Sequence, residues 1–141
     1  MKKRNKYIKQ FKEALKNENL KFTLQRLQVF NVLLDNKGHY ECEDIMNMLL
    51  DMEIKVSRAT VYRTLDILVK YDFVRKLVLD DGIAKYENKL DTSHHDHMIC
   101  IETGKILEFH CDEIETLQEE IALKAGYKIV KHVHQLFVKK I

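Results

Sequence analysis

The spacing of apolar residues changes near Tyr71, and this change constrains the fold more than any other feature of the 141-residue chain. Before Tyr71, apolar residues such as Ile45 and Leu49 recur three or four positions apart, which is the period of a helix that buries one face. After it, an apolar and β-branched run over residues 73–79 leads into Asp80-Asp81-Gly82, a strong hairpin signal. Helices followed by a hairpin are the order of a winged helix-turn-helix, which places a helix in the major groove of DNA.

Four helices are expected before the hairpin. The first covers residues of about 5–18, Thr23 caps the second, carboxylates open the third at residues 41–44, and Ser57 caps the fourth. The fourth is the expected recognition helix, because its exposed side chains offer donors and apolar contacts to base edges and phosphates. The predicted DNA-binding residues are Lys21, Arg26, Ser57, Arg58, Thr60, Tyr62 and Arg63.

The last third of the chain predicts a small β-β-α-β unit. Strands are expected at residues 98–101 and 106–109, a helix with a capping-box-like Asp/Glu spacing from Asp112, and a long final strand at residues 127–138. Ile114, Leu117, Ile121 and Ala125 are expected to face inward from that helix. About 50 residues bury little core alone, so we expect a dimer partner to complete the unit. The predicted fold class is α+β: a winged helix-turn-helix domain at 1–87, a hinge at 88–95 and a dimerisation and metal-binding domain at 96–141.

Charge is distributed unevenly along the chain. The first 30 residues hold nine Lys and Arg against two Glu, whereas residues 88–141 hold seven Lys against nine Asp and Glu. A basic front half suits a polyanion, although Lys-rich helices are also simply well solvated. No apolar run approaches the roughly 18 residues of a spanning helix, and no secretory signal follows the basic start, so we expect a cytoplasmic protein without a membrane partner. Three cysteines without a C-x-x-C pair argue against a disulfide framework.

The segment His94-His95-Asp96-His97 predicts a metal site. Imidazole nitrogens and carboxylate oxygens are ligands for divalent first-row metals. On a strand, alternate residues share a face, so His94 and Asp96 point one way and His95 and His97 the other. One segment can therefore contribute to two sites. Isolated groups have plainer interpretations: His39 as a cap, Glu87 as a solvated charge, and His95, His110 and His134 as surface groups.

Several motifs together resemble the ferric uptake regulator (Fur) family. They are Thr23-Leu24-Gln25-Arg26, Ala59-Thr60-Val61-Tyr62-Arg63-Thr64-Leu65, His94-His95-Asp96-His97-Met98-Ile99-Cys100, Gly104-Lys105-Ile106-Leu107-Glu108-Phe109, and Ile114-Glu115 before Leu117-Gln118. The resemblance covers residues from about 20 to 138. It implies a homodimeric, metal-responsive regulator whose winged helix binds an AT-rich palindrome in double-stranded DNA, with Tyr62 and Arg63 contacting bases and phosphates and Lys21 near the minor groove.

The same resemblance implies two metal sites. An inter-domain regulatory site would use His39, Glu87, His97 and Glu108, and a dimerisation-domain site would use His94, Asp96, Glu115 and His132. Many members also hold a structural zinc between two C-x-x-C pairs. Here Thr103 stands in the second place of the first pair, and the chain ends at Ile141 before a second pair, so we expect no Cys₄ zinc.

Fe²⁺ is the expected corepressor, with Zn²⁺ or Mn²⁺ as alternatives in either site. Family members that sense peroxide tend to place Asp where this chain has Glu87 and Glu108, which favours iron. Peroxide, zinc or manganese sensing on the same scaffold stays open as an alternative. A metalloenzyme is disfavoured because four protein ligands leave little room for water or substrate. A metal-independent winged-helix protein with an incidental His cluster is the third interpretation.

Overall fold

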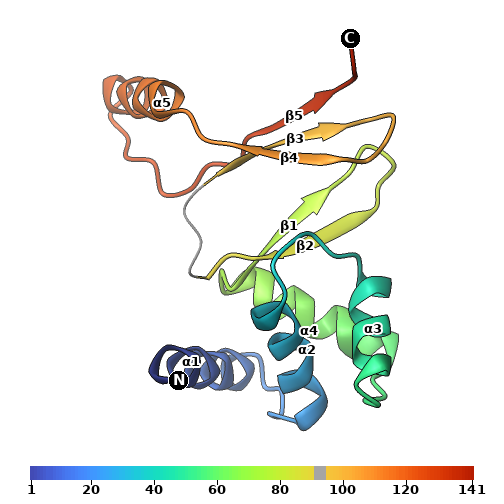
Figure 1. Ribbon diagram of the computed structural model, residues 1–141. Coiled ribbons are helices and arrows are strands. Elements are labelled where there is room, and N and C mark those ends of the chain that lie inside the picture. Colours follow the sequence, from blue (N-terminus) through green and yellow to red (C-terminus); the bar gives the residue numbers. More distant parts are fainter. Residues whose placement is uncertain (91–94) are drawn as a thin grey trace. The chain divides into compact units, whose positions relative to one another are not determined.

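A computed structural model describes residues 1–90 and 95–141, which form two compact units, Met1–Thr92 and Ser93–Ile141. The first unit contains α1 (Lys2–Asn17), α2 (Leu24–Asp35), α3 (Cys42–Asp51), α4 (Arg58–Lys70), β1 (Val74–Val78) and β2 (Ala84–Asn88) (Figure 1). The second contains β3 (Asp96–Cys100), β4 (Ile106–Phe109), α5 (Asp112–Lys124) and β5 (Gln135–Val138). The predicted α+β class is confirmed. Among the described residues, no helix is long and apolar enough to cross a membrane.

Helices α2, α3 and α4 begin at the predicted residues, whereas α1 begins at Lys2, before the predicted start at about residue 5. The Thr23 hydroxyl accepts a hydrogen bond from the backbone N–H of Arg26 at 3.3 Å, and the Ser57 hydroxyl accepts one from Thr60 at 3.2 Å. At α3, the Asp44 carboxylate accepts the backbone N–H of Glu41 at 2.8 Å. Each contact satisfies a donor that the first turn of a helix leaves without a backbone partner.

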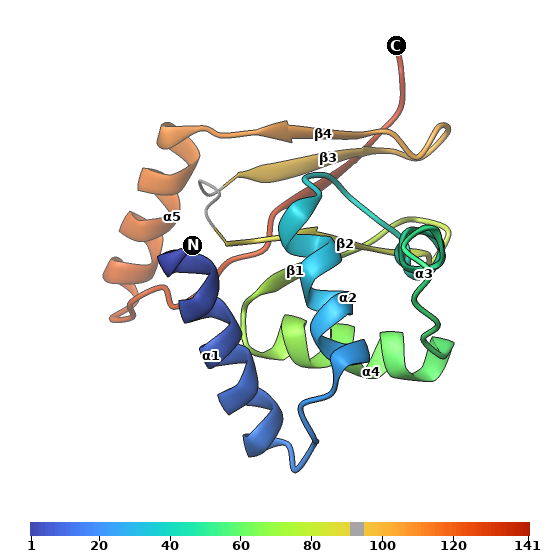
Figure 2. The ribbon, with the colours of Figure 1, turned by 60° about the horizontal axis from the view of Figure 1, so that its bottom comes forward.

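The predicted hairpin follows α4 (Figure 2). Strands β1 and β2 pair antiparallel from Val74↔Asn88 to Val78↔Ala84. Gly82 takes a φ of 82° at the turn, a conformation that side chains with a Cβ rarely adopt, and the Asp81 carboxylate accepts the backbone N–H of Ile83 at 2.9 Å. The hairpin is the wing of a winged helix-turn-helix.

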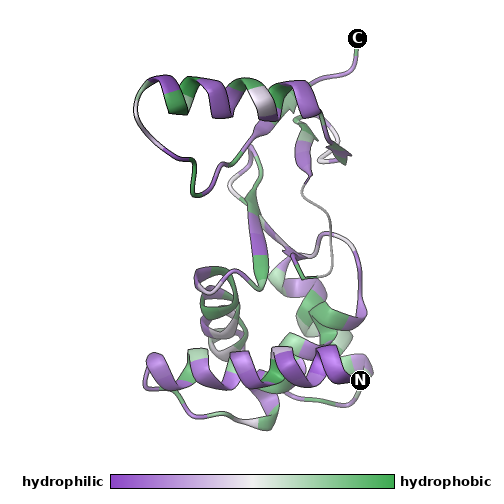
Figure 3. Ribbon diagram, turned by 90° about the vertical axis from the view of Figure 1, so that its left-hand side faces the viewer, coloured by the Kyte–Doolittle hydropathy of each residue, from purple (hydrophilic) through white to green (hydrophobic). Residues whose placement is uncertain are grey.

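Helix α1 is amphipathic, with polar and apolar residues on opposite sides (Figure 3). Phe11, Ala14 and Leu15 are buried, while the lysines of this helix are exposed. Arg4 donates to the Asp35 carboxylate at 2.5 Å and to the Asn31 side chain at 2.8 Å, so the start of α1 is bound to the end of α2. The basic surface predicted from the sequence is therefore carried by a helix that packs on the core.

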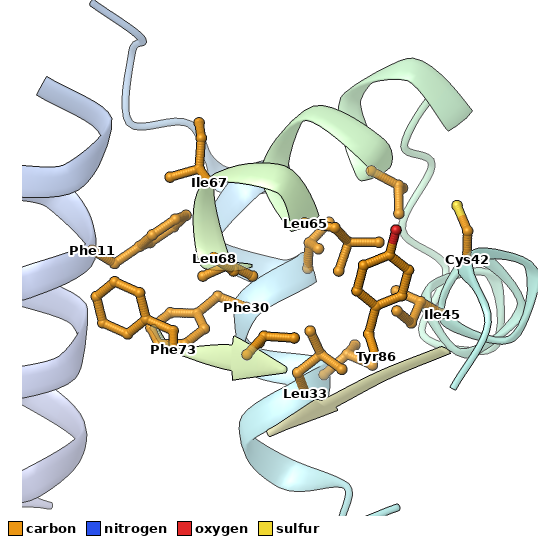
Figure 4. Close-up of a cluster of buried hydrophobic side chains, with 14 of the residues drawn as sticks. Phe11, Phe30, Leu33, Cys42, Ile45, Leu65, Ile67, Leu68, Phe73 and Tyr86 are labelled. Atoms are coloured by element: carbon orange, nitrogen blue, oxygen red, sulfur yellow. The ribbon is translucent and has the colours of Figure 1, made fainter. Parts of the chain in front are cut away.

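Aromatic rings form the centre of the core of the first unit (Figure 4). The Phe30 ring centroid lies 4.9 Å from that of Phe11 and 5.3 Å from that of Phe73, in tilted and edge-on arrangements. Leu65 and Leu68 of α4 are fully buried in the same cluster. Offset and edge-on ring pairs add to the stabilisation from burial alone, so this unit has a core of its own.

The second unit is a three-stranded sheet with one helix. Its strand order is β4-β3-β5, with β3 antiparallel to β4 and parallel to β5. Helix α5 lies in the connection from β4 to β5, so the predicted β-β-α-β order is confirmed. The predicted long strand at 127–138 is wrong, because only Gln135–Val138 is a strand. Strand β3 has five residues and pairs with β5 from His97↔Gln135 to Cys100↔Val138, so the pairing with β3 begins only at the end of the predicted segment.

Helix α5 differs from its prediction in two respects. Cys111 is its N-cap residue and makes no side-chain capping bond, so the expected capping box is wrong; the acidic residues instead occupy the first turn, where the helix dipole favours them. The prediction that the apolar residues of α5 face inward is also wrong for a single chain. Leu117 is 57% exposed and Ile121 is 62% exposed, and none of the residues of α5, all of which are described, is buried.

Candidate metal and nucleic-acid sites

Three potential metal ligands meet within the second unit. Asp96 begins β3, Glu115 lies in the first turn of α5, and His132 lies in the segment that precedes β5. The Nε2 atom of His132 lies 3.2 Å from Oδ1 of Asp96 and 3.5 Å from Oε1 of Glu115. One ligand atom from each residue lies within 4.8 Å of the others, so one ion can be reached by all three side chains.

The donor set of this cluster fits a divalent first-row metal. It offers one imidazole nitrogen and two carboxylate oxygens, a combination that suits Zn²⁺, Fe²⁺ and Mn²⁺. Three protein ligands are one fewer than the four that were predicted from the sequence. The fourth, His94, lies outside the described residues. Three of the four predicted residues thus lie together, although the prediction that His132 lies on a strand is wrong.

A histidine and a glutamate face each other on the other side of the same sheet. His97 of β3 is the register partner of Glu108 of β4, and residues directly opposite in an antiparallel pair project to the same face. Asp96, one residue earlier, projects to the opposite face. His95 Nε2 lies 3.3 Å from Glu108 Oε1, in keeping with the predicted alternation, which places His95 and His97 on the same face. This face of the second unit thus carries two imidazoles beside one carboxylate.

The first unit carries a similar pair. Tyr40 and Tyr86 exchange two backbone hydrogen bonds, of 2.9 Å and 2.7 Å, which bind the segment before α3 to strand β2. As a result, Nε2 of His39 lies 3.4 Å from Oε2 of Glu87. Arg75 of β1, the register partner of Glu87, also lies 3.4 Å from that oxygen. Glu87 is therefore held by two neighbours, one of which, Arg75, the sequence did not indicate.

The predicted recognition helix presents the expected side chains. Val61 and Leu65 are buried, while Arg63 is exposed and Tyr62 is 43% exposed. The Ser57 hydroxyl donates to Oγ1 of Thr60 at 2.9 Å, so both hydroxyls stand at the N-terminus of α4. Backbone N–H groups at such a terminus attract phosphate.

Two further residues predicted to bind DNA lie at the start of α2: Lys21 precedes the helix, and Arg26 is in its first turn. Lys21 is exposed, and the guanidinium of Arg26 donates to the backbone carbonyl of Lys21. This contact closes the turn between α1 and α2 and holds Lys21 in place. Arg26 therefore has a structural role that the sequence did not predict.

An ion pair next to the recognition helix was also missed. Arg58, the first residue of α4, donates to Oε2 of Glu43 in the first turn of α3 at 2.6 Å, and the carboxylate raises the pKa of the guanidinium. The two residues are 15 positions apart, so no short-range pattern indicates the contact. Only the packing of α3 against α4 brings them together.

The three cysteines are free, in keeping with the sequence-based rejection of a disulfide framework. Burial raises the pKa of the Cys42 thiol, whereas hydrogen bonds from Thr103 lower that of Cys100. Thr103, which stands in the second place of the expected C-x-x-C pair, thus acts on Cys100 through hydrogen bonds.

Comparison with known proteins assigns this chain to one family. Residues 17–137 match the model of the ferric uptake regulator family. The ferric uptake regulation protein of Escherichia coli K12 is 38% identical over 125 residues, which are 88% of this chain and 84% of that protein. The Fur structure of Helicobacter pylori, described as having three functional metal binding sites, superposes with a TM-score of 0.82 at 32% identity and covers 96% of this chain and 90% of its own.

A second solved structure agrees. The ferric uptake regulator of Pseudomonas aeruginosa with manganese has a TM-score of 0.79 at 34% identity and covers 91% of this chain and 96% of its own. Sequence and fold thus point the same way, and the chain belongs to the ferric uptake regulator family, whose members are metal-responsive transcription regulators and not enzymes.

Proposed function

We propose that this chain is a homodimeric DNA-binding repressor with Fe²⁺ as its corepressor. The observation that carries the proposal is a His–Glu pair in each unit: His39 with Glu87 in the first, and His97 with Glu108 in the second. Two nitrogens and two carboxylate oxygens make a complete ligand set for a divalent ion when the pairs come together. In this proposal, the four residues form one inter-domain regulatory site.

An ion held by these four ligands supplies a link between the units. The four side chains bind it only in arrangements of the units that bring the pairs together, so its binding shifts the population toward those arrangements. If DNA binds the same arrangements, DNA and ion tighten each other's binding by the same factor. No base contact has to change for the signal to pass.

The DNA side of the proposal uses the exposed face of α4 and the turn before α2. Tyr62 and Arg63 would contact bases and phosphates in the major groove, Lys21 and Arg26 the backbone or minor groove, and the N-terminus of α4 a phosphate. The predicted set is Lys21, Arg26, Ser57, Arg58, Thr60, Tyr62 and Arg63. A two-fold dimer matches a palindromic operator, which the resemblance predicts to be AT-rich. A genomic target places the protein in the cytoplasm.

The second proposed site supports the dimer. Asp96, Glu115 and His132, with His94 as fourth ligand, would hold an ion that joins β3, α5 and the segment before β5. The exposed apolar side chains of α5, Leu117 and Ile121, are the surface that a second copy would cover. An exposed apolar face of this kind favours association.

The proposal also names iron as the metal that the regulatory site binds. Glu rather than Asp at positions 87 and 108 favours iron, while the relative from Pseudomonas aeruginosa was solved with manganese. Imidazole and carboxylate ligands also suit zinc. A peroxide sensor on this scaffold would show oxidation of a ligating histidine by mass spectrometry after exposure to peroxide.

The test is an anaerobic titration of metal-free protein with Fe²⁺, Mn²⁺ and Zn²⁺ at fixed salt. Binding is followed to an AT-rich palindromic duplex and to a scrambled duplex. We expect the affinity for the palindrome to rise at least tenfold, roughly 1.4 kcal/mol, and to fall again with a chelator. Equal affinity with and without metal would overturn the proposal, and the ion that acts at cellular concentrations identifies the signal.

The inter-domain site is tested by His97→Ala and Glu108→Ala. Each removes a ligand that only the regulatory site uses, so metal activation of DNA binding is expected to be lost while the circular dichroism spectrum stays unchanged. His110→Ala is the matched control, because His110 is an exposed histidine outside both proposed ligand sets. Full activation of both variants would remove His97 and Glu108 from the site.

A further inference from the structure

We infer that Glu43 is a positioning residue that orients Arg58 for reading a base edge in the major groove. The inference rests on the proposed DNA-binding function and extends it to a residue outside the recognition helix. Arg58 lies just before the motif Ala59–Leu65 that carries the family resemblance, so its role comes from geometry alone. The geometry is the 2.6 Å contact between an Nη atom of Arg58 and Oε2 of Glu43.

The position of Arg58 suits a base contact. It is the first residue of α4, and the N-terminal residues of a recognition helix are those that reach base edges. Tyr62, one turn later, lines the same open cleft as Arg58, together with Lys76 and Ile83 of the hairpin. Arginine pairs with O6 and N7 of guanine through two of its donors, the most frequent specific contact in the major groove.

The backbone around Glu43 is held in place by its neighbours in the first turn of α3. Cys42, next to it, is buried, and the Asp44 carboxylate fixes the first turn of α3 through the backbone N–H of Glu41. The backbone of Glu43 therefore holds a defined place, and the contact of one Nη atom with its carboxylate restricts the orientations of the guanidinium. The remaining donors of the guanidinium stay available for a base.

The ion pair contributes little to the stability of the fold. Both side chains are 55% exposed, and ion pairs between exposed side chains add little net stability in water. Its effect is expected at the DNA surface instead. There the carboxylate has two consequences: it orients Arg58, which favours the correct base, and its negative charge weakens the attraction for any phosphate backbone.

The experiment compares the wild type with Glu43→Gln, Arg58→Ala and the double variant at saturating Mn²⁺. Each protein selects duplexes from a random library, and its affinity for the selected and a scrambled duplex is measured at several salt concentrations. For Glu43→Gln, we expect tighter binding to the scrambled duplex and at least a fivefold loss of preference at one base pair of each half-site, since one bidentate pair discriminates by roughly 5- to 150-fold.

Arg58→Ala is expected to lose the same preference, because it removes the side chain that reads the base edge. The double variant should match Arg58→Ala in its base preference, because Glu43 acts on that preference only through Arg58. It should bind the scrambled duplex more tightly than Arg58→Ala, because the negative charge of Glu43 is gone. Asp51→Asn is the control, since it removes one exposed carboxylate from the other end of α3. It should change neither the preferred base nor the salt slope.

Wild-type base preference in Glu43→Gln would overturn the inference. If that variant does not fold, Glu43→Asp serves instead: the charge stays but the shorter side chain should weaken the preference without tightening binding to the scrambled duplex, and an unchanged preference would again overturn it. If metal activates DNA binding by the wild type but neither Glu43 variant changes the base preference, only this inference is refuted. A wild type that binds no duplex refutes the proposed function and this inference together.

Discussion

The two units of this chain differ in how much of their apolar surface they bury. The first encloses a cluster of rings and leucines around Phe11, Phe30 and Phe73. In the second, Ile99 is the one buried apolar side chain among the described residues, and Leu117 and Ile121 are more than half exposed. The first unit therefore has the core of an independently folding domain, whereas the stability of the second unit is expected to depend on what it binds.

The second unit also places polar groups where the first has a core. Asp96 and His97 are buried at the start of β3, beside His132 on one face and Glu108 on the other. Burying such groups costs free energy unless they are paired or bind a metal. The stability of this unit is thus expected to respond to metal and to a second copy of the chain, while that of the first unit responds to its own packing.

The largest expected effect tests the core of the first unit. Leu65→Ala removes a fully buried side chain from α4, and we expect it to lower the free energy of unfolding by about 2–5 kcal/mol. Urea titration followed by the far-ultraviolet circular dichroism of the helices measures the loss. Leu50→Ala is the matched control, because Leu50 of α3 is 54% exposed, and it should change the free energy by less than about 0.5 kcal/mol. Equal losses would show that the cluster around Phe30 is not a tight core.

Metal dependence is the next largest effect and concerns the second unit. His132→Ala removes the imidazole that contacts both Asp96 and Glu115. A ligand at 100 times its dissociation constant stabilises a protein by about 2.7 kcal/mol, so Zn²⁺ should raise the melting temperature of the wild type and raise that of the variant much less. His110→Ala should behave as the wild type. The same metal-induced rise in His132→Ala would remove His132 from the site.

Dimer stability should be the third effect in size. Leu117→Ser replaces an exposed leucine of α5, and we expect the dimer to dissociate roughly tenfold more readily, about 1.4 kcal/mol, if a second copy covers this face. Leu50→Ser is the control, with nearly the same exposure on a helix of the first unit. Sedimentation at several concentrations gives the association state. Unchanged association in Leu117→Ser would move the interface away from α5.

The sequence was informative wherever a signal is local. The caps Thr23 and Ser57 and the turn at Gly82 each depend on one residue and its close neighbours, and the structure confirms them. The alternation of a strand likewise separated Asp96 from His97. Local chemistry of this kind can be recognised without knowledge of the rest of the fold.

The sequence was less informative where the outcome depends on a partner. Residues 127–134 were predicted to belong to the last strand, but β5 begins at Gln135, and the apolar side chains Leu117 and Ile121 of α5 are exposed. The contacts of Glu43 with Arg58 and of Arg75 with Glu87 join different elements of the fold. Each of these features is decided by tertiary packing, which no short-range pattern records.

The smallest predicted effect concerns an ion pair between α1 and α4. The Glu18 carboxylate accepts hydrogen bonds from Nζ of Lys70 and, at 3.0 Å, from the hydroxyl of Tyr71, and these bonds lower the pKa of Glu18 below its usual value near 4.5. A carboxyl with a lowered folded-state pKa adds stability that is fully present above its unfolded-state pKa and is lost as the pH falls through the folded-state value. Glu18→Gln should therefore be less stable than the wild type at pH 7, and the difference should shrink as the pH falls below the unfolded-state pKa and disappear below the folded-state value.

Urea titrations of metal-free protein at pH 7 and at lower pH measure this difference, and added salt should reduce it because the pair is exposed. Glu13→Gln is the control, as Glu13 is an exposed carboxylate on α1. A pH-independent deficit in Glu18→Gln would mean that the side chain acts by packing rather than by charge. Glu18→Gln should lower the stability of the first unit alone. The stabilisation of the second unit by metal should then be the same in the variant and in the wild type.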